Sequence, residues 1–328
     1  MTSSKPPSLR ELNRTLLLRQ LLLERKRMSV VRAVHHLVAL QAQYAPSPYV
    51  ALWSRLVDFR KEQLHDERIV KAGTLRTTLH VQTRELYPAL ASAYIESQRA
   101  RENRLGVDIG ALRKAVGRKQ LTSAELFELG YRVLGTDDRW TVAFAYRALP
   151  FVRTAPLGPW PHTKPSPVAL WRETLPDPAE SAVRIVHAYL AAYGPATRDD
   201  IQHFTGFKIR QIAPALEGLT EEGGYYDLPG APRATGKERA PVRFLPAFDS
   251  IILAHKDTSR IIPPEHYTRV HNKKNATSKN TFTVDGFTMG TWRVEKKQLL
   301  LDPFEALSPK WRREVDAEGE RLLAWYLS

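Results

Sequence analysis

The stretch SAVRIVHAYLAAYGPATRDDIQHFTGFKIRQIAPALEGL, residues 181–219, contains the clearest local unit of the chain. It opens with an amphipathic helix that ends at Gly194. Thr197 follows, with Asp200 three residues later, which predicts a capped helix start. This second helix is short and ends at Gly206, and a third helix follows it. Helix, cap, short helix, glycine turn and helix together predict a helix-turn-helix unit.

Two details qualify this unit. Pro214 suits the first turn of a helix that starts near Ile212, but not the middle of one that starts at Lys208. Beyond Gly223 and Gly224, the run YYDLP predicts the first strand of a wing.

Similar units are predicted elsewhere in the chain. Ser8 with Glu11, and Thr122 with Glu125, are two further capping boxes that predict helix starts. From about residue 240 the chain becomes β-rich, and the Asp285-Gly286 pair predicts a two-residue hairpin.

We therefore predict an α+β protein in four parts. These are an N-terminal winged-helix-like unit with a glutamine motif (1–115), a second such unit with a proline-rich connector (116–180), a third winged-helix unit (181–240) and a β-rich C-terminal part with the hairpin and a terminal helix (241–328).

The net charge of the 328-residue chain is +14, with a pI near 9.9. Such an excess favours a polyanionic partner, because each phosphate contact releases condensed counterions. General solubility is the alternative explanation, and we rank nucleic acid ahead of it.

Several classes of function are not expected. The chain has no cysteine, so disulfide and thiolate chemistry are excluded. It has no G-x-S-x-G or H-E-x-x-H motif, and its histidines lack a compact metal-ligand spacing. We therefore expect no metal and no cofactor. No apolar run is long enough to span a membrane, and the N-terminus lacks a signal-peptide core. A cytoplasmic protein is predicted.

The second informative stretch is LQAQYAPSPYVALWSRL, residues 40–56. A helix that starts near Ser29 carries an inward stripe whose next position is Gln41, on its last turn. Gln43 lies at or past the helix end, because Pro46 disfavours helical geometry before it. A buried glutamine needs polar partners, so it faces either a structural network or a wet cleft. From spacing alone, a structural cap of the helix is favoured.

The stretch TLRTTLHVQT, residues 74–83, alternates polar and apolar residues. This pattern predicts a strand with Arg76, Thr78 and His80 on one polar, basic face. A solvated face and a DNA-binding face are equally compatible with it. In the C-terminal part, Trp292 is expected in the core, and its neighbour Arg293 could reach a phosphate. Asp249 and Asp257 are either structural acids or line the DNA channel.

The chain as a whole resembles the AlkZ-type winged-helix DNA glycosylases, known for azinomycin self-resistance. The resemblance covers nearly the full chain and rests on blocks in the same order. They are LQAQ (40–43) with SPYVALWSRL (47–56), TLRTTLH (74–80), AYGPATRDDIQHFTG (192–206), LPAFDSIILAHKD (245–257) and VDGFTMGTWR (284–293).

This resemblance implies tandem winged helices around a concave DNA channel. It also implies that Gln41 and Gln43, which match the family's glutamine-variable-glutamine motif, are catalytic. We assign the main water-orienting role to Gln43 and a supporting role to Gln41. Arg76, Thr78, His80 and Arg293 are then candidate contacts to DNA or to the lesion.

The implied chemistry suits glutamine. An amide is no strong base, but it can orient a water molecule. A cationic N7- or N3-alkylpurine is already a good leaving group, so little further activation is needed. The resemblance thus implies a monofunctional glycosylase acting on double-stranded DNA with alkylated purines, including bulky adducts or interstrand crosslinks. We expect it to act as a monomer without an obligate protein partner.

Two other functions stay open from the sequence. A non-catalytic winged-helix transcription factor would also have the helix-turn-helix pattern and the charge. A drug-sequestering resistance protein would bind a free genotoxin without DNA.

Overall fold

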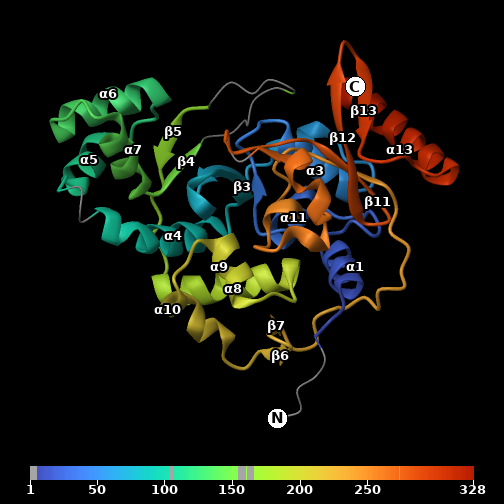
Figure 1. The fold of residues 1–328 in the computed structure, drawn as a ribbon. Coiled ribbons are helices and arrows are strands. Elements are labelled where there is room, and N and C mark those ends of the chain that lie inside the picture. Colours follow the sequence, from blue (N-terminus) through green and yellow to red (C-terminus); the bar gives the residue numbers. More distant parts are fainter. Residues whose placement is uncertain (1–5, 103–105, 154–159, 161–165, 273) are drawn as a thin grey trace.

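The computed structural model describes residues 6–102, 106–153, 160, 166–272 and 274–328. Helices and strands are mixed along the chain, as the α+β prediction requires (Figure 1). The helices are α1 (Leu9–Arg19), α2 (Val30–His36), α3 (Ser47–Arg55), α4 (Tyr87–Glu102), α5 (Ile109–Val116), α6 (Ser123–Leu134), α7 (Arg139–Arg147), α8 (Pro178–Tyr193), α9 (Arg198–Thr205), α10 (Ile209–Ile212), α11 (Ser250–Leu253), α12 (Tyr267–Val270) and α13 (Pro309–Leu327).

The strands form two larger sheets and two hairpins, with orders β1-β3-β2-β4-β5, β13-β12-β11-β8, β6-β7 and β9-β10. Their bounds are β1 (Leu40–Gln41), β2 (Ile69–Gly73), β3 (Leu79–Thr83), β4 (Phe151–Arg153), β5 (Val168–Leu170), β6 (Thr220–Glu222), β7 (Tyr225–Asp227), β8 (Arg243–Leu245), β9 (His271–Asn272), β10 (Thr277–Ser278), β11 (Thr281–Val284), β12 (Phe287–Glu295) and β13 (Gln298–Pro303).

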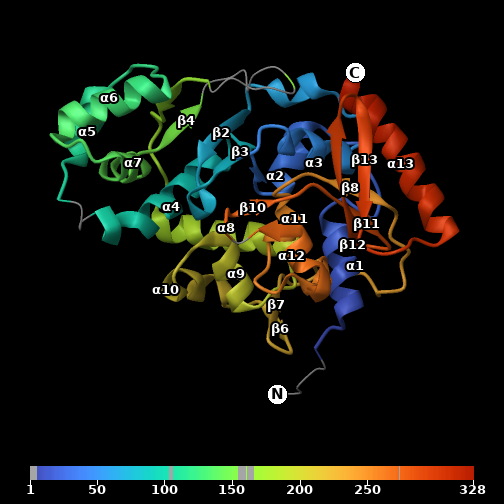
Figure 2. The same ribbon diagram turned by 45° about the horizontal axis from the view of Figure 1, so that its top comes forward.

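The first sheet joins segments that are far apart in the sequence. β4 and β5 follow the α5–α7 lobe, yet they extend the sheet begun by β1, β2 and β3. The lobe itself has its own small core and stands apart from the central body in Figures 1 and 2. The four-part division of the chain therefore stays a prediction. Most of the proline-rich connector near residue 160 lies outside the described residues.

The helix-turn-helix unit forms as its residues predict. Asp200 and Thr197 complete the capping box of α9, and Gly206 ends that helix in the left-handed conformation. Pro214 lies in a short 3₁₀ helix, Ala213–Leu216, that follows α10 directly. The third helix is thus broken at the proline, as the sequence suggested. The strand at Tyr225–Asp227 is the second of the β6–β7 hairpin, not the first.

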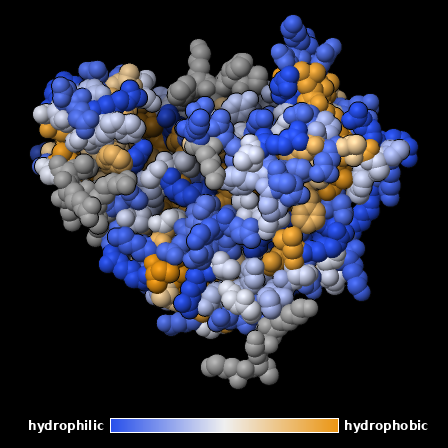
Figure 3. All heavy atoms as spheres, in the orientation of Figure 1, coloured by the Kyte–Doolittle hydropathy of each residue, from blue (hydrophilic) through white to orange (hydrophobic). Residues whose placement is uncertain are grey.

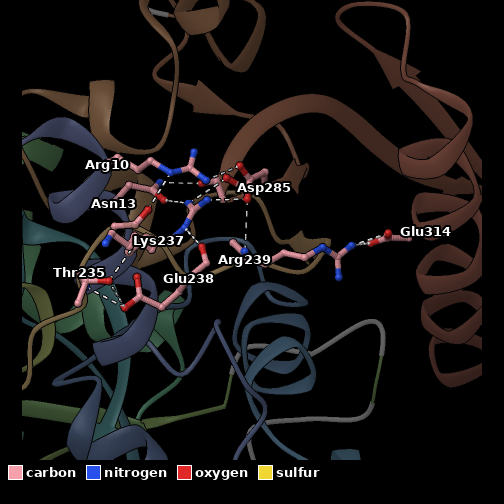
Figure 4. Close-up of polar contacts among 12 residues, drawn as sticks. Arg10, Asn13, Thr235, Lys237, Glu238, Arg239, Asp285 and Glu314 are labelled. Atoms are coloured by element: carbon pink, nitrogen blue, oxygen red, sulfur yellow. Dashed lines mark hydrogen bonds and ion pairs between the residues drawn. The ribbon is translucent and has the colours of Figure 1, made fainter.

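The Asp285-Gly286 hairpin is confirmed between β11 and β12, where Val284 pairs with Phe287. Both turn residues have positive φ, which a two-residue turn of this kind requires. Its tip is held by α1: Arg14 donates from Nη2 to the Asp285 carboxylate at 2.5 Å, and Arg10 does so at 3.0 Å (Figure 4). Asn13 donates to the Gly286 carbonyl at 2.9 Å.

We call these contacts between α1 and the hairpin tip the hairpin lock. Arg14 also donates to the Glu238 carbonyl at 2.6 Å, and Arg239 pairs nearby with Glu314 of α13 (Figure 4). The turn is therefore built into the body of the protein. These contacts give it the role of a structural turn.

The face seen in Figure 3 is mostly hydrophilic, with smaller hydrophobic patches. Within the described residues, no helix is both long and apolar enough to cross a membrane.

Candidate active site

The glutamine motif begins on a strand, so the helix predicted for Gln41 is wrong. α2 ends at His36, and Val38 adopts a positive φ of 67° that stops the helix. β1 then pairs with β3 in antiparallel register, Leu40 with Val81 and Gln41 with His80. Tertiary strand pairing has overridden the helical spacing of the apolar residues.

The two glutamines occupy different environments. Gln41 is buried, with 8% of its surface exposed, whereas Gln43 is exposed on the loop that follows β1. Ala42 between them is buried in the core beneath α3. Within the described part of the chain, the Gln41 Oε1 atom has no hydrogen-bond partner. A buried acceptor without a partner costs about 1–3 kcal/mol, so this position is not explained by stability.

The segment before β3 departs from the predicted strand. Residues Leu75–Thr77 form a 3₁₀ turn, with positive φ at Arg76 (50°) and Thr77 (64°). Such backbone angles are costly for residues other than glycine, and they concentrate at functional sites. Only Leu79–Thr83 is extended, so Arg76 does not share a strand face with His80 as predicted.

Arg76 is a largely enclosed cation. Its Nη1 donates to the Leu253 carbonyl at 3.1 Å, and its guanidinium lies 5.6 Å from the centre of the Phe204 ring. Burial lowers the pKa of Arg76. No ion pair joins it to a carboxylate anywhere in the described ranges. An enclosed cation without a carboxylate partner can bind an anion that a ligand supplies.

His80 is fully enclosed and neutral. Burial, with the Arg76 charge as the next cause, lowers the pKa of His80 to about 3. Its Nδ1 lies 3.0 Å from the Thr78 carbonyl, which can only accept, so Nδ1 carries the proton. Thr78 itself is half-buried and donates its hydroxyl to the Leu75 carbonyl at 3.2 Å. We call Gln41, Thr78, His80 and the adjoining Arg76 the motif face.

A buried ion pair that the sequence did not reveal supports the motif. Arg55 of α3 binds the Asp249 carboxylate at 2.7 and 2.8 Å, and both side chains are fully buried. Asp249 also caps α11, and the next residue, Ser250, donates to the Ala39 carbonyl at 3.0 Å. Asp257 caps a 3₁₀ turn at Thr258–Arg260. Both acids thus have structural roles, and the pairing of Arg55 required the tertiary fold to find.

A cavity of about 460 Å³ adjoins the motif on its C-terminal side. Tyr44, the residue after Gln43, lines it together with Phe248, Trp292 and Arg293. Trp292 is buried as predicted, and its indole N–H lies 3.0 Å from the Leu245 carbonyl. Arg293 is exposed and pairs with Glu295 at 3.2 Å. The structure thus places Arg293 at this cavity, apart from the residues of the motif face.

A second cavity of about 330 Å³ shares Phe248 with the first. Its lining includes Lys256 and two histidines, His203 and His271, and burial lowers the pKa of both histidines. Nothing in the sequence pattern linked these residues. No group of three or more metal-binding side chains occurs in the part of the chain that the structure describes.

Comparison with known proteins identifies the family. The family model "DNA glycosylase AlkZ-like" matches residues 34–325. Among solved structures, the Streptomyces sahachiroi DNA glycosylase AlkZ has a similar fold, with a TM-score of 0.78 and 21% sequence identity over 97% of each chain. No curated protein sequence matches the chain. Since the family model spans most of the chain and includes the glutamine motif, the protein belongs to the AlkZ-like family of DNA glycosylases.

Proposed function

We propose that the enzyme hydrolyses the N-glycosidic bond of cationic N7- and N3-alkylated purines in double-stranded DNA. The observation that carries this proposal is the uncharged character of the motif. Gln41 and Gln43 are amides, and His80 beside them is neutral. None of them is a strong base or a nucleophile near neutral pH. A substrate for such a site must therefore already contain a good leaving group.

A cationic purine does so. When the bond between C1′ and the purine nitrogen breaks, its electron pair neutralises the positive charge on the base. A water molecule then adds to C1′ and loses one proton, which leaves an abasic site and a free alkylpurine. The protein has to position that water and stabilise the positive sugar, for which oriented amides suffice. A neutral, undamaged base is a poor leaving group and is spared.

Each candidate residue has a role in this proposal. Gln41 and Gln43 are the catalytic residues, while Arg76, Thr78, His80 and Arg293 contact DNA or the lesion. The reaction needs no cofactor, and the protein works as a cytoplasmic monomer. Bulky adducts and interstrand crosslinks are included as substrates, because the 460 Å³ cavity lined by Tyr44, the residue after Gln43, leaves room for a large substituent.

The decisive experiment is single-turnover excision of N7-methylguanine from a labelled duplex, read out by alkaline cleavage of abasic sites. Wild type is compared with Gln41→Ala and Gln43→Ala. Removal of an oriented hydrogen-bonding group from an active site typically lowers the rate on the order of 10²-fold or more. Loss of cleavage in either variant with unchanged DNA affinity supports the proposal. Equal cleavage by all three proteins assigns the glutamines to structure.

A wild-type protein that leaves both methylated and bulky N7-adducts intact would overturn the proposed substrate class. Tight binding to one undamaged sequence would then favour a regulatory function. Binding that is sensitive to salt and indifferent to sequence is the result that we expect for a repair enzyme.

A further inference from the structure

We infer that Gln41 Oε1 and His80 Nε2 together hold the hydrolytic water, which makes His80 a catalytic residue and not only a DNA contact. This inference rests on the proposed function and assigns its water site. It shifts the main water-orienting role from Gln43 to Gln41.

The register brings the two side chains together. Leu79 accepts a hydrogen bond from the directly opposite Ala42 at 2.8 Å, which makes that pair the hydrogen-bonded one. The next pair along the ladder, Gln41 and His80, is therefore of the non-hydrogen-bonded kind. In such pairs both side chains project from the same face, with Cα atoms only about 4.5 Å apart.

The neighbours on that face leave the two side chains space. On its other side His80 pairs with Ala72 of β2, which has only a methyl group. Gln41 is the last residue of β1, at the point where the chain emerges toward exposed Gln43. The pair thus lies at the border between the core and the surface, where a water molecule can enter.

Both side chains present an acceptor. Gln41 Oε1 is buried without a hydrogen-bond partner among the described residues. Because the proton of His80 is on Nδ1, directed at the Thr78 carbonyl, Nε2 carries a free lone pair. Nε2 likewise has no hydrogen-bond partner in the described structure. A water molecule donates two hydrogen bonds, so two converging acceptors hold both of its hydrogens and leave an oxygen lone pair free for C1′.

The charge balance of the step is simple. The new bond joins the water oxygen to C1′ as the bond from C1′ to the purine nitrogen breaks, and that electron pair stays on the purine. The added water becomes a strongly acidic oxonium, which gives one proton to Nε2 and from there to solvent. The positive charge of Arg76 and the burial of the ring disfavour a lasting imidazolium, so His80 returns to its neutral form.

The test compares His80→Phe, which keeps a ring but removes the acceptor, with His80→Gln, which keeps an acceptor. Gln82→Leu is the control, because Gln82 is fully buried on the same face of β3 but is not paired with a residue of the glutamine motif. We expect single-turnover excision to fall about 100-fold in His80→Phe and to recover substantially in His80→Gln. In each His80 variant we expect DNA affinity to change far less than the excision rate, and in Gln82→Leu we expect it to stay unchanged.

Two results overturn the inference. One is excision by His80→Phe at the same rate as by wild type. The other is an equal loss in His80→Phe and Gln82→Leu, which would indicate a general packing defect.

A second measurement does not depend on activity, so it separates this inference from the proposed function. In ¹⁵N-histidine-labelled wild type at pH 7, we expect the His80 resonances to report a protonated Nδ1 and an unprotonated Nε2. A high-resolution crystal structure should then place one ordered water within hydrogen-bond distance of Nε2 and Gln41 Oε1. A proton on Nε2, or a dry contact between the two side chains, overturns the water site whatever the protein cleaves.

Discussion

The hairpin lock and the motif face differ in whether their arginines are paired with a carboxylate. In the hairpin lock, Arg14 and Arg10 both bind Asp285, so each cation has a carboxylate within 3.0 Å. On the motif face, Arg76 has only a backbone carbonyl and an aromatic ring for partners among the described residues.

This difference distinguishes cations that stabilise the fold from cations that can bind a ligand. A buried cation that is already neutralised adds to the specificity of the fold and offers nothing to a ligand. A cation left without a carboxylate keeps its attraction for a phosphate, at a cost in stability. The net charge of +14 is therefore less informative than the places where the positive charge is unpaired.

The largest effect is expected at the hairpin lock. Arg14→Met removes a fully buried partner and leaves the Glu238 and Asp285 carbonyls without their donor. We expect the free energy of unfolding to fall by about 3 kcal/mol, as for other broken buried pairs. Urea denaturation measures it, with Arg10→Met as the matched control, since Arg10 is half exposed and its loss should cost about 1 kcal/mol or less. Equal losses of stability in the two variants would mean that the hairpin lock acts through the exposed Arg10–Asp285 pair alone.

Arg76→Met should have an intermediate effect, on binding and not on stability. We expect affinity for an undamaged duplex to fall about tenfold, and the slope of log K against log salt to fall by about one, as for a lost phosphate contact. Fluorescence anisotropy at several salt concentrations measures both quantities. Unchanged affinity with a clear loss of stability would make Arg76 a structural tie between the motif face and Leu253.

The smallest effect is expected at Lys71, on the same sheet. Lys71 is half-buried and pairs in register with Arg153, and burial and then that charge lower the pKa of Lys71 to about 8. Lys71→Met should therefore raise the free energy of unfolding at pH 7, by about 1 kcal/mol after allowance for solvent screening.

The pH dependence supplies the control. Between about pH 8 and 10 the unfolded chain still holds the Lys71 proton that the folded protein has released, so wild-type stability rises with pH. The advantage of Lys71→Met should shrink over this range. Lys256→Met is the comparison. Asp199 raises the pKa of Lys256, so the contribution of Lys256 to stability changes with pH in the opposite direction. If the difference in the free energy of unfolding between Lys71→Met and wild type stays constant with pH, Lys71 is not desolvated in solution.

Local signals predicted local structure well. The capping boxes at Ser8, Thr122 and Thr197 each start a helix, and Asp285-Gly286 makes its hairpin. These features depend on hydrogen bonds between residues at most three positions apart, so they can be seen in the sequence.

Features that depend on distant partners were missed. Gln41 was predicted on a helix because β1 exists only through pairing with β3, about forty residues later. The strand predicted through Arg76 failed because a strained turn there lets its side chain reach Leu253. The catalytic roles of Gln41 and Gln43 came from family resemblance and not from spacing, and they stay predictions.

The hairpin lock also has a consequence for how the protein is made. Arg14 and Asp285 are 271 positions apart, and the buried pair of Arg19 with Asp227 spans 208. Contacts of such long sequence separation form late and slow folding. While the middle of the chain is still being synthesised, Arg14 and Arg19 of the α1 segment lack the carboxylates that pair with them in the folded protein. The α1 segment is thus synthesised long before its partners and is among the last to reach its native contacts, so it is open to non-native contacts until the C-terminal sheet has been made.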